Sequence, residues 1–207
     1  MLSEIDERIG TLSSPSKMPG YSWSISANHC QTGGALSKVP GTPCFSCYAR
    51  KGRYTFPAVQ NALEKRLTGY RDDPDWVKLM AIRLVLHSEK HPYFRWFDSG
   101  DLQDETMFYR ICFVASHTEG FVKHWLPTQE RKYIVGTTPQ NLNVRVSSTK
   151  LDEIQTNSIP DTTNSAVADK GIDKDVYFCP SKKQGNKCGA CRACWDKTIG
   201  HVVYAKH

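Results

Sequence analysis

The chain has 207 residues, of which 39% are hydrophobic and 23% charged, and its formal net charge is +6. This length and composition fit one globular domain, and no apolar run approaches the roughly 20 residues that a membrane-spanning helix needs, so we expect no membrane partner. Lysines and arginines are scattered without a long basic run, so the charge alone does not indicate a nucleic-acid partner.

The first part of the chain alternates between strand and helix patterns. Residues 1–20 are polar and interrupted by proline and glycine, after which bulky and small side chains alternate over 21–26 with the period of a strand. The glycines and prolines of the following loop, 30–47, argue against regular structure there. Apolar residues then recur at helical spacing over 57–70, and a second, mostly apolar helix is predicted over 76–88.

The alternation continues in the second part. An aromatic run at 93–97 predicts a buried strand, and a helix is expected over 105–117. Further strands are predicted over 123–128 and 142–146. Strands that alternate with helices favour an α/β fold of parallel strands joined by crossover helices, in an open sheet or a partial (β/α) barrel.

The C-terminal third is less regular. Residues 152–175 are rich in Thr, Asn, Ser and Asp and lack an apolar period, so we expect a long loop. A final short strand is predicted over 201–204. We interpret residues 1–175 as the main unit and 176–207 as a cysteine-rich C-terminal extension packed on the same domain.

Eight cysteines are the most informative residues. The N-terminus is acidic where a secretory signal would be basic and then apolar, which predicts a cytoplasmic protein whose thiols stay reduced. Metal ligation then explains the cysteines better than disulfides do. Four of them follow the spacing Cys179-x8-Cys188-x2-Cys191-x2-Cys194. Such crowding is typical of a [4Fe–4S] cluster, and a zinc site is the alternative.

A second group has only three members, with the spacing Cys30-x13-Cys44-x2-Cys47. Three thiolates leave a fourth position for another ligand, whereas the structural alternative is a core Cys30 and half of a zinc site. Cys112 lies in an apolar helical pattern and is interpreted as a core residue. His29 is an alternative ligand, although thiolates are the usual ligands of iron–sulfur clusters.

The sequence motifs resemble the radical-SAM superfamily, and more closely a bacteriophage family with radical-SAM-like motifs. The resemblance covers about residues 21–196. It rests on Cys44-Phe-Ser-Cys-Tyr-Ala-Arg-Lys-Gly-Arg-Tyr54, on Asp98-Ser-Gly-Asp101 and on the segment from Cys179-Pro to Cys194-Trp195. In this chain the spacing between the first two cysteines is longer than in the superfamily, and Ser46 replaces the aromatic residue that usually precedes the last one.

The resemblance implies a partial barrel of radical-SAM type and two clusters. Cys30, Cys44 and Cys47 would hold a [4Fe–4S] cluster whose fourth iron binds S-adenosylmethionine (SAM), and the amino group of SAM would meet Ser99, Gly100 and Asp101. The C-terminal cysteines would hold an auxiliary [4Fe–4S] cluster.

The resulting hypothesis is a radical-SAM-type enzyme with an unknown substrate, active in the host cytoplasm if phage-encoded. An electron donor such as ferredoxin or flavodoxin is the implied partner. Two alternatives stay open: a non-catalytic iron–sulfur protein for electron transfer or redox sensing on a degenerate barrel, and a zinc-binding adaptor.

Overall fold

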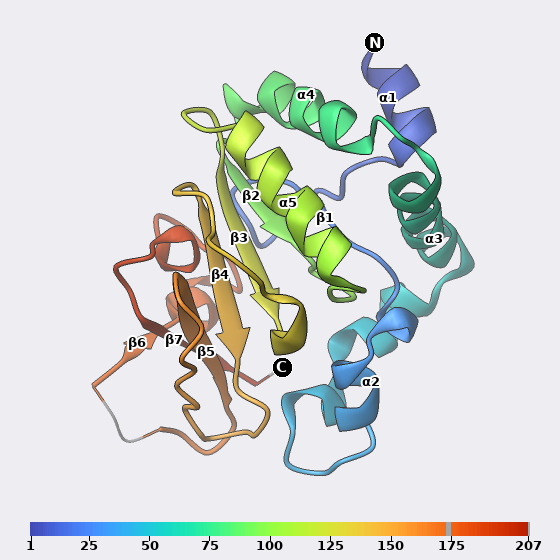
Figure 1. Ribbon diagram of the computed structural model, residues 1–207. Helices are drawn as coiled ribbons and strands as arrows, with labels where there is room; N and C mark the ends of the chain where they lie inside the picture. Colours follow the sequence, from blue (N-terminus) through green and yellow to red (C-terminus); the bar gives the residue numbers. More distant parts are fainter. Residues whose placement is uncertain (173–174, 207) are drawn as a thin grey trace.

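A seven-stranded sheet forms the centre of the protein, seen in a computed structural model that describes residues 1–172 and 175–206 (Figure 1). Every pair of neighbouring strands in the sheet is parallel. The spatial order is β1-β2-β3-β4-β5-β7-β6, so the first five strands are neighbours in chain order. The strands are β1 (Ser22–Trp23), β2 (Tyr93–Trp96), β3 (Lys123–Thr128), β4 (Leu142–Ser147), β5 (Thr162–Ala168), β6 (Tyr177–Phe178) and β7 (His201–Ala205).

The helices precede or connect the first strands, and α4 and α5 lie across β2 and β3 in Figure 1. They are α1 (Leu2–Ile9), α2 (Thr32–Leu36), α3 (Pro57–Asp72), α4 (Trp76–Ser88) and α5 (Glu105–His117). Short 3-10 helices occupy the loops: η1 (Ala27–His29), η2 (Pro43–Ser46), η3 (Tyr48–Arg50), η4 (Gly52–Thr55), η5 (Arg131–Tyr133), η6 (Pro180–Gln184) and η7 (Ala193–Trp195).

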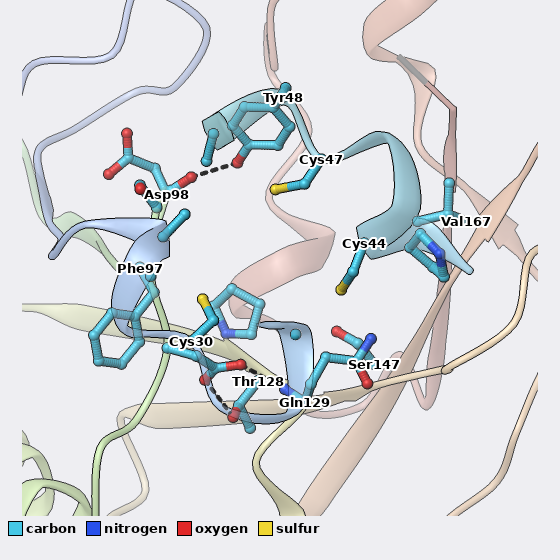
Figure 2. A pocket seen from close by; sticks show the side chains of 18 of the residues that line it. Cys30, Cys44, Cys47, Tyr48, Phe97, Asp98, Thr128, Gln129, Ser147 and Val167 are labelled. Atoms are coloured by element: carbon cyan, nitrogen blue, oxygen red, sulfur yellow. Dashed lines mark hydrogen bonds between the residues drawn. The ribbon is translucent and has the colours of Figure 1, made fainter. Parts of the chain in front are cut away.

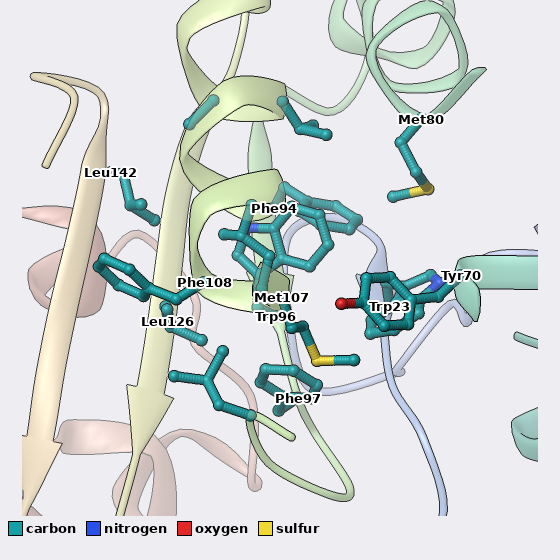
Figure 3. Packing of buried hydrophobic residues seen from close by; sticks show 14 of the residues in the cluster. Trp23, Tyr70, Met80, Phe94, Trp96, Phe97, Met107, Phe108, Leu126 and Leu142 are labelled. Atoms are coloured by element: carbon teal, nitrogen blue, oxygen red, sulfur yellow. The ribbon is translucent and has the colours of Figure 1, made fainter. Parts of the chain in front are cut away.

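The main hydrophobic core lies between the helices and one face of the sheet (Figure 3). Side chains of a strand alternate between its two faces. In β2, Phe94 and Trp96 are buried in this core, whereas Tyr93 packs on the opposite face. There Tyr93 and Trp125 meet Trp195 at ring-centroid distances of 5.3 and 5.5 Å. The C-terminal cysteine segment therefore covers the face of the sheet that the helices leave free.

The α/β class and the parallel sheet are confirmed, and so are the predicted helices that became α3, α4 and α5. The helix α5 begins as its sequence predicts, because the Asp104 carboxylate accepts a hydrogen bond of 2.7 Å from the Met107 N–H. Strands β2, β3, β4 and β7 also lie where the alternating pattern placed them.

The expectation of a loop over 152–175 is wrong for its central part. Residues 162–168 form β5, an interior strand between β4 and β7, while residues 173–174 lie outside the described residues. The strand escaped prediction because its buried face is polar. Thr163 and Ser165, for example, bond to Asn143 and Ser147 of β4 instead of facing an apolar core.

Regular structure was also missed near the N-terminus. Residues Leu2–Ile9 form α1, and the glycine-rich cysteine loop contains α2 and η2. Helix α2 forms despite its glycines because Glu130 accepts a hydrogen bond of 2.6 Å from the first-turn Thr32 N–H, as an N-cap side chain would. The first strand is shorter than predicted, Ser22–Trp23. No helix among the described residues combines the length and apolarity required to cross a bilayer.

Candidate functional site

The strands of the sheet end around one cavity of about 230 Å³ (Figure 2). The carboxyl ends of parallel strands are the usual position of ligand sites in α/β proteins. The turn after β2, the last residues of β3 and β4, and the end of β5 all contribute to the wall. The lining includes Cys30, Cys44, Cys47, Arg95, Asp98, Ser99, Gly100, Asp101, Gln129, Ser147 and Val167. We call the three cysteines the N-terminal cysteine site.

Two of these thiols lie on either side of a space that a glycine leaves free. A Cβ placed on Gly33 would lie 3.5 Å from Cys44 Sγ and 3.7 Å from Cys30 Sγ. The third thiol, Cys47, lines the same cavity and points into it in Figure 2. The structure therefore brings together the three cysteines that the sequence grouped, although thirteen residues separate Cys30 from Cys44.

Burial and nearby negative charges favour the protonated form of two of these thiols, Cys30 and Cys44. Burial raises the pKa of Cys30 far above its usual range, and the charges of Asp101, Cys47 and Cys44 add to the effect. Burial, Cys47 and Asp101 raise the pKa of Cys44 to about 12. A bound metal cation would reverse this preference, because thiolates are the form that ligates metals.

Hydrogen bonds from distant segments hold the cysteine loop in place. Glu130, fully buried, accepts bonds of 2.6 Å from both the N–H and the hydroxyl of Thr32. The Leu151 N–H donates to the Gly41 carbonyl over 2.8 Å. The loop is thus attached to the ends of β3 and β4, which reduces the ordering cost of binding a ligand there.

The acidic turn after β2 holds neighbouring segments together through hydrogen bonds to Asp98. Asp98 accepts hydrogen bonds from the hydroxyls of Ser22, Ser24 and Tyr54. Its backbone carbonyl accepts another from the Tyr48 hydroxyl, which fixes the residue next to Cys47. The turn therefore ties the wall of the cavity to β1 and to the cysteine loop.

The three residues assigned to a SAM amino group lie in the cavity wall, but their roles differ. Asp101 accepts bonds from Thr128 Oγ1 (2.6 Å) and from the N–H groups of Leu102 and Gln129 (2.8 Å each). Burial raises its pKa to about 7, against the opposing effect of these donors. Gly100 has φ +79° and a Cβ there would lie 2.7 Å from the Ile25 carbonyl oxygen, so only glycine fits.

Two buried polar atoms in the wall have no partner among the described residues. They are Ser99 Oγ, in a residue that is 3% exposed, and Gln129 Oε1, in a residue that is 9% exposed. A buried polar atom without a hydrogen bond is costly, so such atoms in a cavity indicate a missing polar ligand or water. Ser99 was among the predicted residues, whereas Gln129 was not.

The other site contains the remaining four predicted ligands, Cys179, Cys188, Cys191 and Cys194, which we call the C-terminal cysteine site. Three of the sulfur atoms contact a hydroxyl at 3.1 to 3.3 Å: Cys191 meets Tyr177, Cys179 meets Ser181 and Cys194 meets Tyr204.

Burial and neighbouring thiols raise the pKa of two cysteines of the C-terminal cysteine site. Burial and the charges of Cys179 and Cys191 raise the pKa of Cys188. The pKa of Cys194 is raised to about 12, mainly by burial, with Cys179 and Cys188 contributing. As for Cys30 and Cys44, the uncharged forms of Cys188 and Cys194 are favoured until a cation joins them.

A fully buried arginine anchors this second site. Arg145 of β4 donates hydrogen bonds to the carbonyls of Cys194 (3.3 Å), Ala193 (2.7 Å), Asp196 (3.0 Å) and Ile199 (3.0 Å). It also donates to the Asn164 carbonyl, but no carboxylate side chain pairs with it among the described residues. Burial lowers its pKa, against the charges of Tyr204 and Cys194. An anionic metal–thiolate centre would balance this buried charge.

Arg95 of β2 lies between the two sites. Its guanidinium is 4.5 Å from the centre of the Trp125 ring and bonds to the Phe97 carbonyl and, over 3.5 Å, to the Tyr48 hydroxyl. Burial lowers its pKa, but nearby charges, including Asp98 in one site and Cys194 in the other, raise it more. Sequence reasoning missed Arg95 and Arg145, although each is a lone arginine in an otherwise buried strand pattern.

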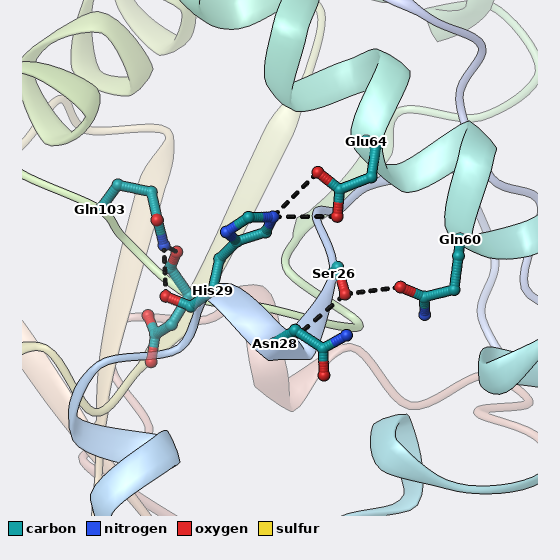
Figure 4. Close-up of polar contacts among 7 residues, drawn as sticks. Ser26, Asn28, His29, Gln60, Glu64 and Gln103 are labelled. Atoms are coloured by element: carbon teal, nitrogen blue, oxygen red, sulfur yellow. Dashed lines mark hydrogen bonds and ion pairs between the residues drawn. The ribbon is translucent and has the colours of Figure 1, made fainter.

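His29 does not join the cysteines. Its Nε2 lies 2.9 Å from both carboxylate oxygens of Glu64 on α3, and Gln103 bonds to its carbonyl (Figure 4). Cys112 packs against the core as predicted, and burial raises its pKa to about 12. Among the described residues, no group of three or more His, Cys, Asp or Glu side chains has the geometry for a single metal ion.

The comparisons with known proteins give one result. A family model described as gene product 88 matches residues 6–197, a span that includes both cysteine sites. No curated protein and no solved structure matches the chain.

Proposed function

The chain belongs to the gene product 88 family, and from this premise we propose that it is an iron–sulfur protein of radical-SAM type with two [4Fe–4S] sites. The observation that carries the proposal is the convergence of Cys30, Cys44 and Cys47 on one cavity at the carboxyl ends of the strands. We further propose that the fold is a partial (β/α) barrel of radical-SAM type. Strands β1 to β5 support this, because they follow one another in the sheet in the same order as in the chain.

The N-terminal cysteine site fits a cluster that shares its fourth iron with a ligand. The Cys30 and Cys44 thiols lie beside the space at Gly33, which any larger residue would begin to fill. Three cysteines leave one iron without a protein thiolate, and Ser99 Oγ and Gln129 Oε1 supply unpaired polar atoms in the same cavity. A ligand with both donors and acceptors, as SAM is, would satisfy them.

The protein groups would bind and orient the ligand. Cys30, Cys44 and Cys47 would hold the [4Fe–4S] cluster, which when reduced would supply the electron for cleavage of bound SAM. Arg95 places a cation in the wall, and the hydrogen bonds from Thr32 to Glu130 and from Tyr48 to Asp98 hold the cysteine loop at the wall of the cavity.

The C-terminal cysteine site has the ligands for a closed auxiliary cluster. Four thiolates complete the coordination of a [4Fe–4S] cluster, and Arg145 and Arg95 bring positive charge toward it. Because no iron of this cluster would be open to a substrate, we propose that the cluster has a structural or electron-transfer role. We propose ferredoxin or flavodoxin as the class of electron donor.

One observation favours a second candidate, a non-catalytic iron–sulfur protein. The Asp101 carboxylate already accepts hydrogen bonds from three donors of its own chain, which leaves only one of its roughly four acceptor positions for a SAM amino group. Ligation of a cluster needs only the convergent thiolates, whereas SAM cleavage also needs SAM held in one geometry.

Metal analysis tests the proposal. Protein purified without oxygen should be brown and contain iron and sulfide in equal amounts. Replacing Cys188 and Cys191 together by serine should remove about half of the iron, because four of the seven ligands belong to one of two [4Fe–4S] sites. Colourless protein that contains zinc would rule out both cluster candidates in favour of a zinc-binding adaptor.

Product analysis separates the two cluster candidates. Reduced protein with SAM should form 5′-deoxyadenosine, and the Cys44→Ala variant should form none. If the brown wild-type protein forms no more 5′-deoxyadenosine than this variant, the enzyme is excluded and the non-catalytic candidate stands.

A further inference from the structure

The outer surface of the cysteine loop exposes aromatic and basic side chains together. Helix η2 lines the cavity with Pro43, Cys44 and Ser46, whereas Phe45 between them is 50% exposed. Phe56, which follows η4, is 57% exposed. Four exposed cations belong to this segment. Arg50 is held by a hydrogen bond to the Ala27 carbonyl, and the other three form, with the two phenylalanines, what we call the rim: Lys38, Phe45, Lys51, Arg53 and Phe56.

The charge of the rim is not neutralised locally. From Arg8 to Leu63 the sequence contains six lysines and arginines and no aspartate or glutamate. Lys38, Lys51 and Arg53 form no ion pair within the part of the chain that the structure describes. A surface of this kind attracts anions, and phosphate groups are its most common macromolecular partners.

The cavity lies beside one end of the rim. Pro43, Cys44 and Ser46 of η2 line it, and Phe45 is exposed among them. Because the proposed function assigns the cavity to the cluster and SAM, a substrate would approach it from this exposed side. Proteins that bind single strands contact the backbone with cations and stack successive bases on aromatic side chains.

We propose, building on the function proposed above, that the substrate is a single-stranded nucleic acid. Its phosphates would contact Lys51 and Arg53, and its bases would stack on Phe45 and Phe56, beside the cavity proposed to hold the cluster and SAM. An acidic protein would match the charge, but it would leave the two exposed aromatic rings unexplained.

Binding to a labelled strand tests this substrate class without turnover. The probe is a fluorescein-labelled, mixed-sequence strand of about 20 nucleotides, as DNA and as RNA, added to the full-length protein while anisotropy is followed at several salt concentrations. We expect binding that weakens as salt rises. Replacing Lys51 and Arg53 by glutamine should lower the slope of log affinity against log salt by about 1.4, the value for two phosphate contacts on a single strand.

The contribution of the two phenylalanines to binding should not depend on salt. Replacing Phe45 and Phe56 by alanine should weaken binding about tenfold or more and leave the salt slope unchanged. The matched control is Phe113→Ala with Phe121→Ala, since these two phenylalanines are 57% and 56% exposed but lie outside the rim. Lys78→Gln with Lys90→Gln is the control for charge, because both lysines are exposed and distant in the chain.

Three results would overturn the inference: no binding of either strand at about 50 mM salt, control pairs that weaken binding as much as the rim pairs, or rim-dependent binding of an acidic ferredoxin in place of the strand. Failure of the proposed function looks different. Colourless, zinc-containing protein that binds the strand through the rim would remove the iron–sulfur proposal alone. Brown protein that forms 5′-deoxyadenosine but binds no strand would remove this inference alone.

Discussion

The two cysteine sites of this protein differ in how completely their polar groups are used. Around the C-terminal cysteine site, three thiols contact hydroxyls and Arg145 bonds to five backbone carbonyls. Around the N-terminal cysteine site, Ser99 Oγ and Gln129 Oε1 have no partner among the described residues. Because unpaired buried polar atoms are costly, we expect a polar ligand or water at the N-terminal cysteine site.

The largest effect on stability should come from the anchor of the C-terminal cysteine site. Arg145→Met removes the donor from five carbonyls, and the free energy of unfolding should fall by about 3 kcal/mol or more, because each buried carbonyl left without a donor costs roughly 1 to 3 kcal/mol. Urea denaturation measures the change. Arg131→Met is the control, because Arg131 is only partly buried and its one side-chain bond, to the Ser147 carbonyl, is worth about 1 kcal/mol.

The iron content of Arg145→Met tests whether the anchor serves only one of the two cysteine sites. The C-terminal cysteine site should lose iron, whereas the N-terminal cysteine site should keep its iron. Equal destabilisation by Arg145→Met and Arg131→Met would contradict the anchoring role.

An intermediate effect on the free energy of unfolding should come from pH, through a buried histidine in the sheet that carries both cysteine sites. His124 of β3 is fully buried, and burial lowers its pKa from 6.5 to about 3. Below about pH 6.5 the unfolded chain therefore takes up a proton that the folded chain does not bind. Stability should be constant above that pH with respect to this group, and should fall by about 1.4 kcal/mol for each pH unit below it, until about pH 3.

Urea denaturation across pH 4 to 7 measures this dependence, and His124→Phe should remove this part of it. An unchanged slope in His124→Phe would assign the acid sensitivity to other groups. Loss of structure at only one cysteine site on acidification would show that the two sites do not depend on the sheet equally.

The smallest effect on stability, with a large effect on metal content, is expected at Gly33. The added Cβ in Gly33→Ala meets Cys30 Cβ at 3.3 Å and Cys44 Sγ at 3.5 Å, so the free energy of unfolding should change by less than about 1 kcal/mol while the space for a cluster shrinks. Iron analysis should show loss of about half of the iron.

The neighbouring Gly34→Ala is the matched control, because it lies in the same helix and its Cβ would meet only Arg50 Nη2 at 3.7 Å within contact range. It should keep all of its iron. If Gly33→Ala also keeps its iron, the cluster does not occupy the space between Cys30 and Cys44.

The sequence pattern was a reliable guide to elements with an apolar period. Helices α3, α4 and α5 pack regularly spaced apolar residues, and β4 buries the alternating Leu142, Val144 and Val146. Strand β5 was missed because Thr163, Asn164 and Ser165 are buried by hydrogen bonds and not by apolar contacts. A polar strand in the interior of a sheet is indistinguishable from a loop until its partners are known.

For the two cysteine sites as well, some features could be predicted from the sequence and others could not. The sequence by itself indicated two groups of metal-ligating cysteines, because closely spaced cysteines are typical of metal sites. Only the tertiary structure decided that Cys30 meets Cys44 and Cys47, that Asp101 is already bonded to the end of β3, and that Arg145 anchors the second group. These facts depend on hydrogen bonds and packing between residues far apart in the chain, and no local pattern encodes where such partners will meet.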